Sequence, residues 1–265
     1  MTALRCFVDG IAFWAPTLPG WEIARAAFRG EGTAVDPPLK RPSPDLLAPA
    51  ERRRAPDSVA LALEVASAAT KASGRDPKTL ASIFTSAHGD LSVNDYMCAT
   101  LATTPTAISP TRFHNSVHNA AAGYWTIGTG CRAASTALSA FDSSFAAGLL
   151  EAATQCAADG EAVLLVAFDV NAAGALASVT ASEGLLAVAL VLAPERGDRS
   201  RAGFELTLQR GPTSPAAIRS SAARALAGNG MADALPVFEA LAATTMPALT
   251  LPLSASLALR MEPLA

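Results

Sequence analysis

Residues 137–148 read ALSAFDSSFAAG and have the layout of a nucleophile turn. An apolar run typical of a strand leads to a sharp corner, and the small residues after the corner favour the start of a helix. Enzymes that work through covalent intermediates place a Cys or Ser at such a corner, next to the N-terminus of the helix. Here the corner holds Phe141 and Asp142. The stretch is therefore either an active site with unusual chemistry or a former active site that serves another purpose.

The composition indicates a globular protein. Of the 265 residues, 51% are hydrophobic, mostly Ala, Leu and Val, which is enough to fill a core. The net charge of -3 gives no electrostatic footprint for nucleic acid. No apolar run reaches the roughly eighteen residues of a membrane helix, and no basic segment leads into a signal peptide. We therefore expect a cytoplasmic protein without a membrane span.

The four cysteines, Cys6, Cys98, Cys131 and Cys156, are scattered along the chain. No C-x-x-C pair indicates a zinc site or a redox motif. We interpret all four as buried, reduced thiols. No pattern in the sequence predicts a cofactor.

Strand and helix patterns alternate along most of the chain. Apolar or β-branched runs predict strands at residues 4–14, 80–86, 134–140, 162–168, 185–192, 204–209 and 253–261. Helical patterns occupy residues 21–28, 58–72, 92–101, 111–123, 143–158 and 233–243. Pro56-Asp57-Ser58 are expected to cap the second of these helices, and Gly74 to end it. The alternation predicts an α/β layered fold with a mixed sheet and covering helices.

Residues 1–265 are interpreted as a single domain with two irregular parts. Residues 30–56 are rich in Pro and charge and predict a loop, and residues 212–265 form an atypical C-terminal tail rich in Ala, Ser and Pro. The loop carries Lys40, Arg41 and the run 52–54, which is Arg-Arg-Arg. These cations either stay solvated or meet an acidic partner.

Polar residues beside the corner are candidates for a site. Asp142 is expected to cap the following helix, and the alternative is a general base or an electrostatic mimic in a vestigial pocket. Ser143 and Ser144 are interpreted as residues of the helix start, because the flanking glycines of a G-x-S-x-G elbow are missing.

Two histidines upstream of the corner resemble a metal motif in their spacing. His114 and His118 are four residues apart and would share one face of a helix, as in a zinc-binding H-E-x-x-H. The residues between them supply no Glu, and no third ligand is in view, so we expect packed or interface histidines rather than a metal site. Arg112, Asn115 and Asn119 are interpreted as hydrogen-bonding residues of a subunit contact.

Residues 109–168 resemble the N-terminal half of beta-ketoacyl synthases, which have the thiolase fold. Laid without gaps, the positions that match the family pattern are Asn119, Ala122, Gly123, Gly130, Arg132 and Ser144. The Cys nucleophile of the family falls on Asp142. The motifs of the second half of the fold, H-G-T-G-T and a later G-H, do not occur, and the chain has about half the usual synthase length. The resemblance therefore implies the N-terminal half of a thiolase-like fold without the catalytic thiol.

The stretch SPTRFHNSVHNAAAGYW, residues 109–125, is similar to that of short synthase-like proteins without the Cys, the chain length factors of aryl polyene biosynthesis. This resemblance implies a non-catalytic subunit that pairs with a full-length ketosynthase as a heterodimer and shapes the cavity in which the acyl chain grows. An acyl carrier protein would be an indirect partner, and its acidity would suit the basic loop.

The resemblance also implies where the partner binds. In the family, the strand before the nucleophile pairs with its counterpart across a two-fold axis. The corresponding residues 134–140 have short, largely uncharged side chains, with Leu138 the largest, and no Lys, Glu or Pro that would block edge pairing. We expect this strand to extend the sheet into the partner, and Phe141 to limit the length of a shared acyl tunnel.

Two other functions stay open at the level of sequence. One is an independent thioester hydrolase or malonyl decarboxylase that uses Asp142, Ser143 or His118. The other is a generic homodimeric scaffold without a role in pigment biosynthesis.

Overall fold

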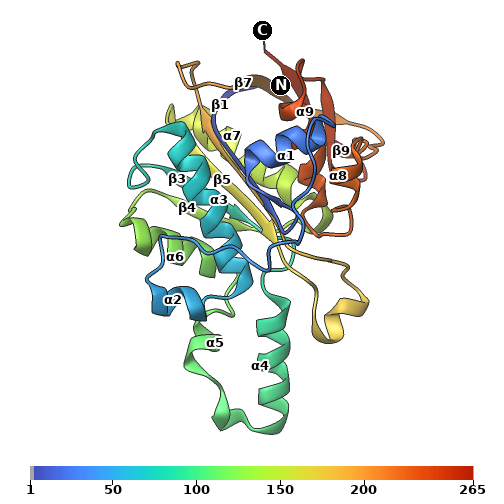
Figure 1. The fold of residues 1–265 in the computed structure, drawn as a ribbon. Helices are drawn as coiled ribbons and strands as arrows, with labels where there is room; N and C mark the ends of the chain where they lie inside the picture. Colours follow the sequence, from blue (N-terminus) through green and yellow to red (C-terminus); the bar gives the residue numbers. More distant parts are fainter. Residues whose placement is uncertain (1–2, 265) are drawn as a thin grey trace.

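A computed structural model describes residues 3–264, which form a nine-stranded sheet with helices on both faces (Figure 1). The strands lie in the order β4-β3-β5-β6-β1-β7-β9-β8, and the short β2 pairs with β1. Their bounds are β1 Leu4–Ala15, β2 Leu18–Pro19, β3 Ala81–Thr85, β4 Ser135–Leu138, β5 Val163–Asp169, β6 Leu186–Ala193, β7 Ala202–Arg210, β8 Leu249–Ser254 and β9 Leu257–Pro263. β3 pairs in parallel with β4 and β5, and the remaining pairs are antiparallel. The predicted α/β fold with a mixed sheet is confirmed.

The sheet divides the hydrophobic core into two clusters, one on each face. The helices are α1 Trp21–Phe28, α2 Pro49–Arg54, α3 Asp57–Ser73, α4 Leu91–Thr103, α5 Pro110–His114, α6 Ala120–Thr129, α7 Ser144–Asp159, α8 Ser221–Arg224 and α9 Leu235–Ala242. One cluster joins the sheet to α7 and α9 and includes Phe145 and Phe238. The other joins it to α3 and α6 and includes Leu61 and Trp125. None of these described helices has the length and apolar character needed to cross a membrane.

The central strands are apolar because both faces of the sheet are covered. All residues of β5 (VLLVAFD) and of β6 (LAVALVLA) are buried. A strand between two helical layers has no solvent-facing side, so it shows no alternation of polar and apolar residues. The parallel strands β4, β3 and β5 lie in this order at one end of the sheet, with their carboxyl ends together.

Helix α3 packs closely on β1 and ends as predicted at Gly74, which has a left-handed φ of 68°. The predicted capping by Asp57 or Ser58 is wrong, because Pro56 is the residue that precedes the helix and no side chain caps it. Ser58 lies inside the helix, where its hydroxyl donates to Asp90 Oδ2 at 2.8 Å.

Three predicted segments differ in the structure. Residues 30–56 are not all loop, because residues 49–54 form α2, whose Pro at the first turn and basic last turn favour a short helix. The predicted helix 111–123 is split into α5 and α6. Asn115 and Ser116 interrupt it, since such side chains compete for backbone hydrogen bonds, and the Ser116 hydroxyl donates to Phe113 O at 2.8 Å. The predicted last strand 253–261 is a hairpin of β8 and β9.

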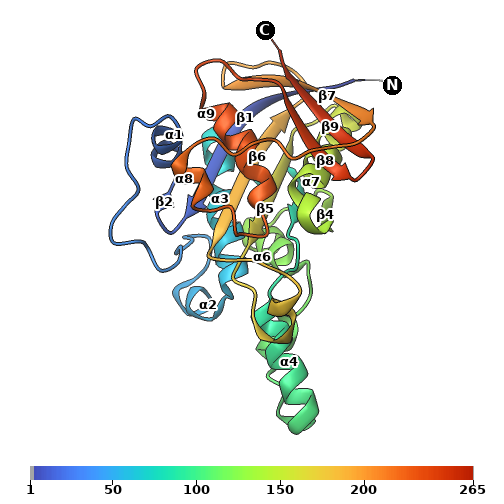
Figure 2. The same ribbon diagram turned by 90° about the vertical axis from the view of Figure 1, so that its right-hand side faces the viewer.

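Helix α4 projects away from the sheet (Figures 1 and 2). It continues through a short 3-10 helix, η1 (Pro105–Ala107), into α5, which returns toward the body. We call residues 91–114 the arm. The described ends of the chain lie at the opposite end of the molecule (Figure 1).

Candidate functional site

The corner after β4 is held in a strained backbone conformation. Phe141 has a φ of 48° and is the non-glycine residue with positive φ within residues 3–264, a region that costs an L-residue about 1 kcal/mol or more. The buried Ser144 fixes the turn, because its hydroxyl donates to Phe141 O at 2.7 Å and accepts from the Ala140 backbone N–H at 3.0 Å. The Phe141 side chain is 70% exposed. The corner thus keeps the strain of a nucleophile turn but presents an aromatic ring.

Asp142 does not cap α7, so that prediction is wrong. Asp142 lies in the 3-10 helix η2 (Phe141–Ser143), and its exposed side chain makes no hydrogen bond within the described part of the chain. The cap comes from Asp233, whose Oδ2 accepts from the backbone N–H groups of Phe145 and Ala146 at 2.9 and 3.2 Å. Burial raises the pKa of Asp233 to about 7. The α7 N-terminus is therefore occupied by a carboxyl group from a distant segment.

A second buried carboxyl group joins the ends of β3 and β5. Asp169 accepts from the Ser86 hydroxyl at 2.7 Å and from the Ala87 N–H at 2.9 Å. Burial raises the pKa of this carboxyl above its ordinary value, although the two hydrogen bonds act in the opposite direction. These contacts fix the turn that follows β3, where His88 lies with its ring 6.0 Å from that of Phe141.

The two histidines of the suspected metal motif lie in different environments. His118 precedes α6, and its Nε2 is 3.0 Å from Ser86 O. His114 ends α5 and packs edge-on against Tyr124, with ring centroids 5.9 Å apart. The expected shared helix face is wrong because the helix is interrupted between them. Within residues 3–264, no group of three or more His, Cys, Asp or Glu is placed to hold a metal ion.

An open pocket of about 440 Å³ lies between α6 and β4. It brings together His118 and Asn119, the Ala122-Gly123 pair, and Ser135 and Ala137 of β4. Thus part of the predicted constellation does assemble, beside the edge strand and not around Asp142.

The other predicted residues have separate roles. The Arg112 guanidinium lies over the Tyr96 ring, 4.2 Å from its centroid. Leu138 is half-buried and packs on the core beneath α7. The Asn115 side chain is buried. No hydrogen bond links Asp142, Ser143 or His118 to one another in the described chain, so no nucleophile and base are paired there.

Strand β4 is an edge strand within residues 3–264. It pairs with β3 alone, and its residues are exposed or half-buried. The backbone N–H groups of Ser82 and Ser86 donate to Ala134 O and Leu138 O. Because successive residues of a strand point their backbone groups to opposite sides, the N–H and C=O of Ser135 and Ala137 face away from the sheet.

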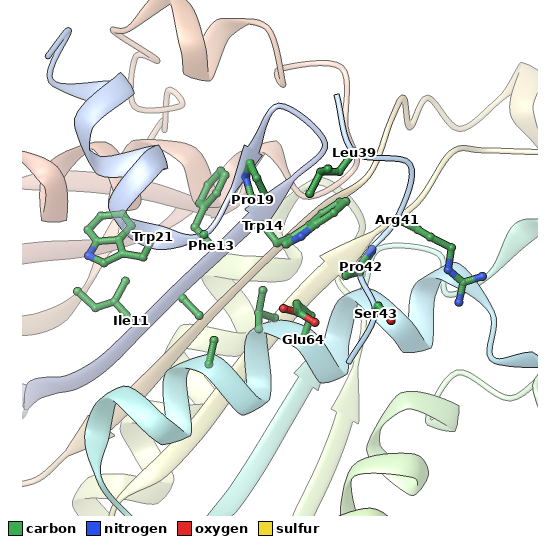
Figure 3. Close-up of a pocket in the computed structure, with 14 residues that line it drawn as sticks. Ile11, Phe13, Trp14, Pro19, Trp21, Leu39, Arg41, Pro42, Ser43 and Glu64 are labelled. Carbon is green, nitrogen blue, oxygen red and sulfur yellow. The ribbon is translucent and has the colours of Figure 1, made fainter. Parts of the chain in front are cut away.

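A separate pocket of about 420 Å³ lies between β1 and α3 (Figure 3). Trp14, Trp21 and Leu39 form much of its wall, with Glu64 on α3. Burial raises the pKa of Glu64. The basic loop closes one side: the Arg41 guanidinium donates to backbone carbonyls and pairs with Asp57 at 3.2 Å. Arg41 therefore ties the loop to the body.

The cysteines lie away from the corner. Cys6, Cys131 and Cys156 are buried free thiols, as predicted, whereas Cys98 is exposed on the arm. Cys6 and Cys156 form a hydrogen bond, which together with burial raises the pKa of Cys6.

Sequence reasoning missed Asp169 and Asp233. An acid directly after an uncharged buried strand, as in VLLVAFD, is a signal that was available for Asp169. No local signal marks Asp233, because it contacts residues 87 and 88 positions away in the chain.

The layered mixed sheet and the strained strand-to-helix corner define the class: a thiolase-like protein of the ketosynthase type whose corner carries no thiol. The chain belongs to the family of the beta-ketoacyl synthase N-terminal domain, whose profile matches residues 29–250.

Solved structures share this fold. A chain of the complex between the ketosynthase ApeO and its chain length factor ApeC from Xenorhabdus doucetiae has a TM-score of 0.75 and 23% identity, over 98% of this chain and 99% of that one. The ishigamide ketosynthase/chain length factor gives 0.71 and 14%, over 98% and 100%. A ketosynthase from module 1 of the bacillaene synthase of Bacillus amyloliquefaciens gives 0.57 and 14%, over 83% and 49%. No curated protein matches the chain.

Proposed function

We propose that this chain is a non-catalytic subunit of the chain length factor type, which pairs with a complete ketosynthase and shapes its acyl-chain cavity. The observation that carries the proposal is the uncovered edge of β4. Its Ser135 and Ala137 offer backbone donors and acceptors to a partner strand, and no charged residue or Pro in residues 134–140 opposes such pairing.

The match of this chain to the solved structures supports this role. It covers nearly the whole of the chains matched in the two ketosynthase and chain length factor structures, but about half of the bacillaene ketosynthase. We also propose that residues 1–265 form a single domain, because the C-terminal β8 and β9 extend the same sheet and Asp233 caps α7.

The corner supports a role without condensation chemistry. A ketosynthase needs a thiolate to accept the acyl group, and Phe141 and Asp142 supply none. The exposed Phe141 ring lies just beyond β4, where a subunit paired at this edge would meet it. We propose that this ring lines the shared cavity in an aryl polyene or similar polyketide pathway of the cytoplasm, with an acyl carrier protein delivering substrate to the synthase subunit.

Co-expression tests the proposal. The chain is produced with Cys-bearing ketosynthases, ApeO and the ishigamide ketosynthase among them, and the assemblies are measured by size exclusion with light scattering. We expect a one-to-one complex with at least one of them. A stable monomer that binds none of these synthases would overturn the proposal.

One substitution tests the edge itself. Ala137→Pro removes an outward N–H and adds a ring where the partner strand would lie, while the bonds from β4 to β3 at Ala134 and Leu138 remain. We expect affinity for the synthase to fall about tenfold or more, since several ladder hydrogen bonds of about 1 kcal/mol each are lost. The matched control Ala137→Ser keeps the N–H and should bind as the wild type does.

A further inference from the structure

An acidic side chain without a partner lies in the pocket between β1 and α3 (Figure 3). Glu64 of α3 is half-buried, and its carboxyl group makes no hydrogen bond or ion pair within residues 3–264. Burial raises the pKa of this carboxyl above its ordinary value, and the charge of Asp45 acts in the same direction. When ionised, such a group has lost part of its hydration without compensation, so it favours a cation beside it.

Two arginines near the pocket are committed to other groups. The Arg41 guanidinium donates to two backbone carbonyls at 3.2 Å each and pairs with Asp57 at 3.2 Å. Figure 3 shows it directed away from Glu64. Arg52 donates to a backbone carbonyl at 3.0 Å and pairs with Asp45 at 3.4 Å. Within the described chain, therefore, no cation is in contact with the Glu64 carboxyl group.

The walls of the pocket are largely apolar and aromatic. Trp14 of β1 and Trp21 of α1 line it, and Leu39 and Pro42 of the Pro-rich loop close one side (Figure 3). The face of a Trp ring attracts cations, most strongly where water is excluded. The volume of about 420 Å³ falls within the range of small-molecule sites, roughly 300–1,000 Å³. The pocket therefore suits an organic molecule with a flat apolar body.

Other classes of ligand fit this pocket less well. Glu64 is the acidic residue among those that line it, and one carboxylate is too few for a divalent metal ion, which takes several oxygen ligands. No group of three or more His, Cys, Asp or Glu is placed to hold a metal within residues 3–264. An anion would meet the carboxylate directly, while Arg41 is turned toward other partners. Charge complementarity thus selects an organic cation.

The pocket is separate from the edge at which we propose that a synthase pairs. In the order of the sheet, β3, β5 and β6 lie between β4 and β1. The residues that line this pocket come from β1, β2, α1, α3 and the Pro-rich loop, and none comes from β4 or the corner. A ligand bound here would therefore not compete with a strand that pairs at β4.

We infer that this pocket is a binding site for a small organic cation, an amine carried on an aryl or similarly flat apolar body, with Glu64 as its counter-charge. The ammonium group donates to the Glu64 carboxylate, and the body lies against Trp14 and Trp21. A charge-assisted hydrogen bond of this kind is stronger than a neutral one. The site is additional to the proposed subunit function and does not rest on it.

Three probes of similar shape and different charge test the site on the full chain. Phenethylamine is protonated near neutral pH, phenethyl alcohol is its neutral counterpart, and hydrocinnamate carries the opposite charge. Ligand-observed NMR and titration calorimetry measure each Kd. We expect a Kd of about 1 mM or tighter for the amine, which is what a ligand of so few atoms achieves. The alcohol should bind about tenfold more weakly, because it lacks the charge, and hydrocinnamate should not bind detectably.

Glu64→Gln removes the charge and keeps the shape of the side chain. We expect this variant to bind phenethylamine about tenfold more weakly than the wild type does, and no better than it binds phenethyl alcohol, because the preference for the amine comes from the carboxylate. Glu22→Gln is the matched control. Glu22 is an exposed acid of α1 that pairs with Arg25 and does not line this pocket, so its variant should keep the wild-type affinity. Thermal unfolding checks that both variants are folded.

A second pair of variants places a cation inside the site. Ala68 is exposed, lines the pocket and follows Glu64 by about one turn of α3. Ala68→Lys puts an ammonium four residues after the Glu, where the two side chains pair on a helix surface. This internal cation should compete with phenethylamine and weaken its binding about tenfold. Ala68→Gln has similar bulk without the charge, so it should bind the amine much more like the wild type.

The outcomes decide the inference without reference to a synthase. Equal binding of amine and alcohol, or unchanged amine affinity in Glu64→Gln, would overturn it. So would the absence of amine binding at millimolar concentration. Binding of a Lys-bearing peptide in place of the free amine would make the occupant a protein side chain, and the small-molecule site would again be wrong. The pairing at β4 is judged separately by co-expression, so either proposal can fail while the other stands.

Discussion

Asp233 Oδ2 lies 2.9 Å from the backbone nitrogen of Phe145, although the two residues are 88 positions apart. The C-terminal region, which looks atypical in sequence, thereby holds the first turn of the helix that follows the corner. The other carboxyl oxygen of Asp233 is buried and has no partner among the described residues. The cap is thus a buried acid whose ionisation is opposed by its surroundings.

This contact predicts a pH-dependent stability. Burial raises the pKa of Asp233 to about 7, above the value of about 4 in an unfolded chain. The folded state therefore binds the proton more tightly, and the stabilisation is present at low pH and lost as the pH rises toward 7. From pH 5 to pH 8 we expect the free energy of unfolding to fall by about 3 kcal/mol from this group.

Asp233→Asn isolates that effect. The amide cannot ionise but still offers an oxygen to the N–H groups of Phe145 and Ala146. Both proteins keep Asp169, so its pH-dependent contribution cancels when the unfolding free energy of the variant is subtracted from that of the wild type. Urea unfolding of both proteins across this pH range is the measurement. Parallel stability curves for the two proteins would contradict the assignment.

Gly10 predicts a large loss of stability when substituted. Its strand β1 passes so close to α3 that a Cβ at this position would collide with the backbone carbonyl of Ala69. Because a backbone atom cannot rotate away, we expect Gly10→Ala to destabilise the protein by about 3 kcal/mol or more. Gly123→Ala is the control, since a Cβ there meets open space, and its effect should stay below about 1 kcal/mol. Thermal unfolding distinguishes the two.

The sheet and its main helices could be predicted because their signals are local. The buried run of β5 and the Gly74 stop of α3 each follow from a short stretch of residues. The break between α5 and α6 was missed because residues 111–123 keep a helical spacing of apolar positions across the interruption. The exposure of Cys98 was missed for another reason: apolar residues indicate burial, and only the three-dimensional path of the arm places this one in solvent.

The site was predictable only in part. Asn119 and the Ala122-Gly123 pair, which the resemblance singled out, line one pocket together with His118, which was a candidate for its spacing from His114. The cap was assigned to Asp142 because an acid before a helix is the usual local signal. The carboxyl group of Asp233 caps α7 instead. A contact between residues so far apart in the chain cannot be predicted from local sequence.

Asp142 itself is predicted to be dispensable. Its side chain is exposed and has no hydrogen bond within residues 3–264. We expect Asp142→Ala to change the free energy of unfolding by less than about 0.5 kcal/mol and to leave product formation by the reconstituted heterodimer intact. The check is product analysis alongside thermal unfolding. Loss of a thioesterase or decarboxylase turnover shown by the isolated wild-type chain would instead favour the independent enzyme.

Phe141 is predicted to control the length of the product. Its ring is 70% exposed in the free chain and lies next to the edge that would meet the synthase. If the ring closes part of a shared cavity, Phe141→Ala should lengthen the acyl products and Phe141→Trp should shorten them, because the growing chain stops where it meets a bulky side chain.

Mass spectrometry of products from the reconstituted complex gives the distribution of chain lengths, with Asp142→Ala as a neighbouring control on the same turn. Association should be measured for each variant, so that a changed length is not confused with a loosened complex. Identical product lengths for all three variants, in complexes of equal affinity, would place the ring outside the cavity and remove Phe141 from the proposed function while leaving the pairing at β4 to be judged on its own test.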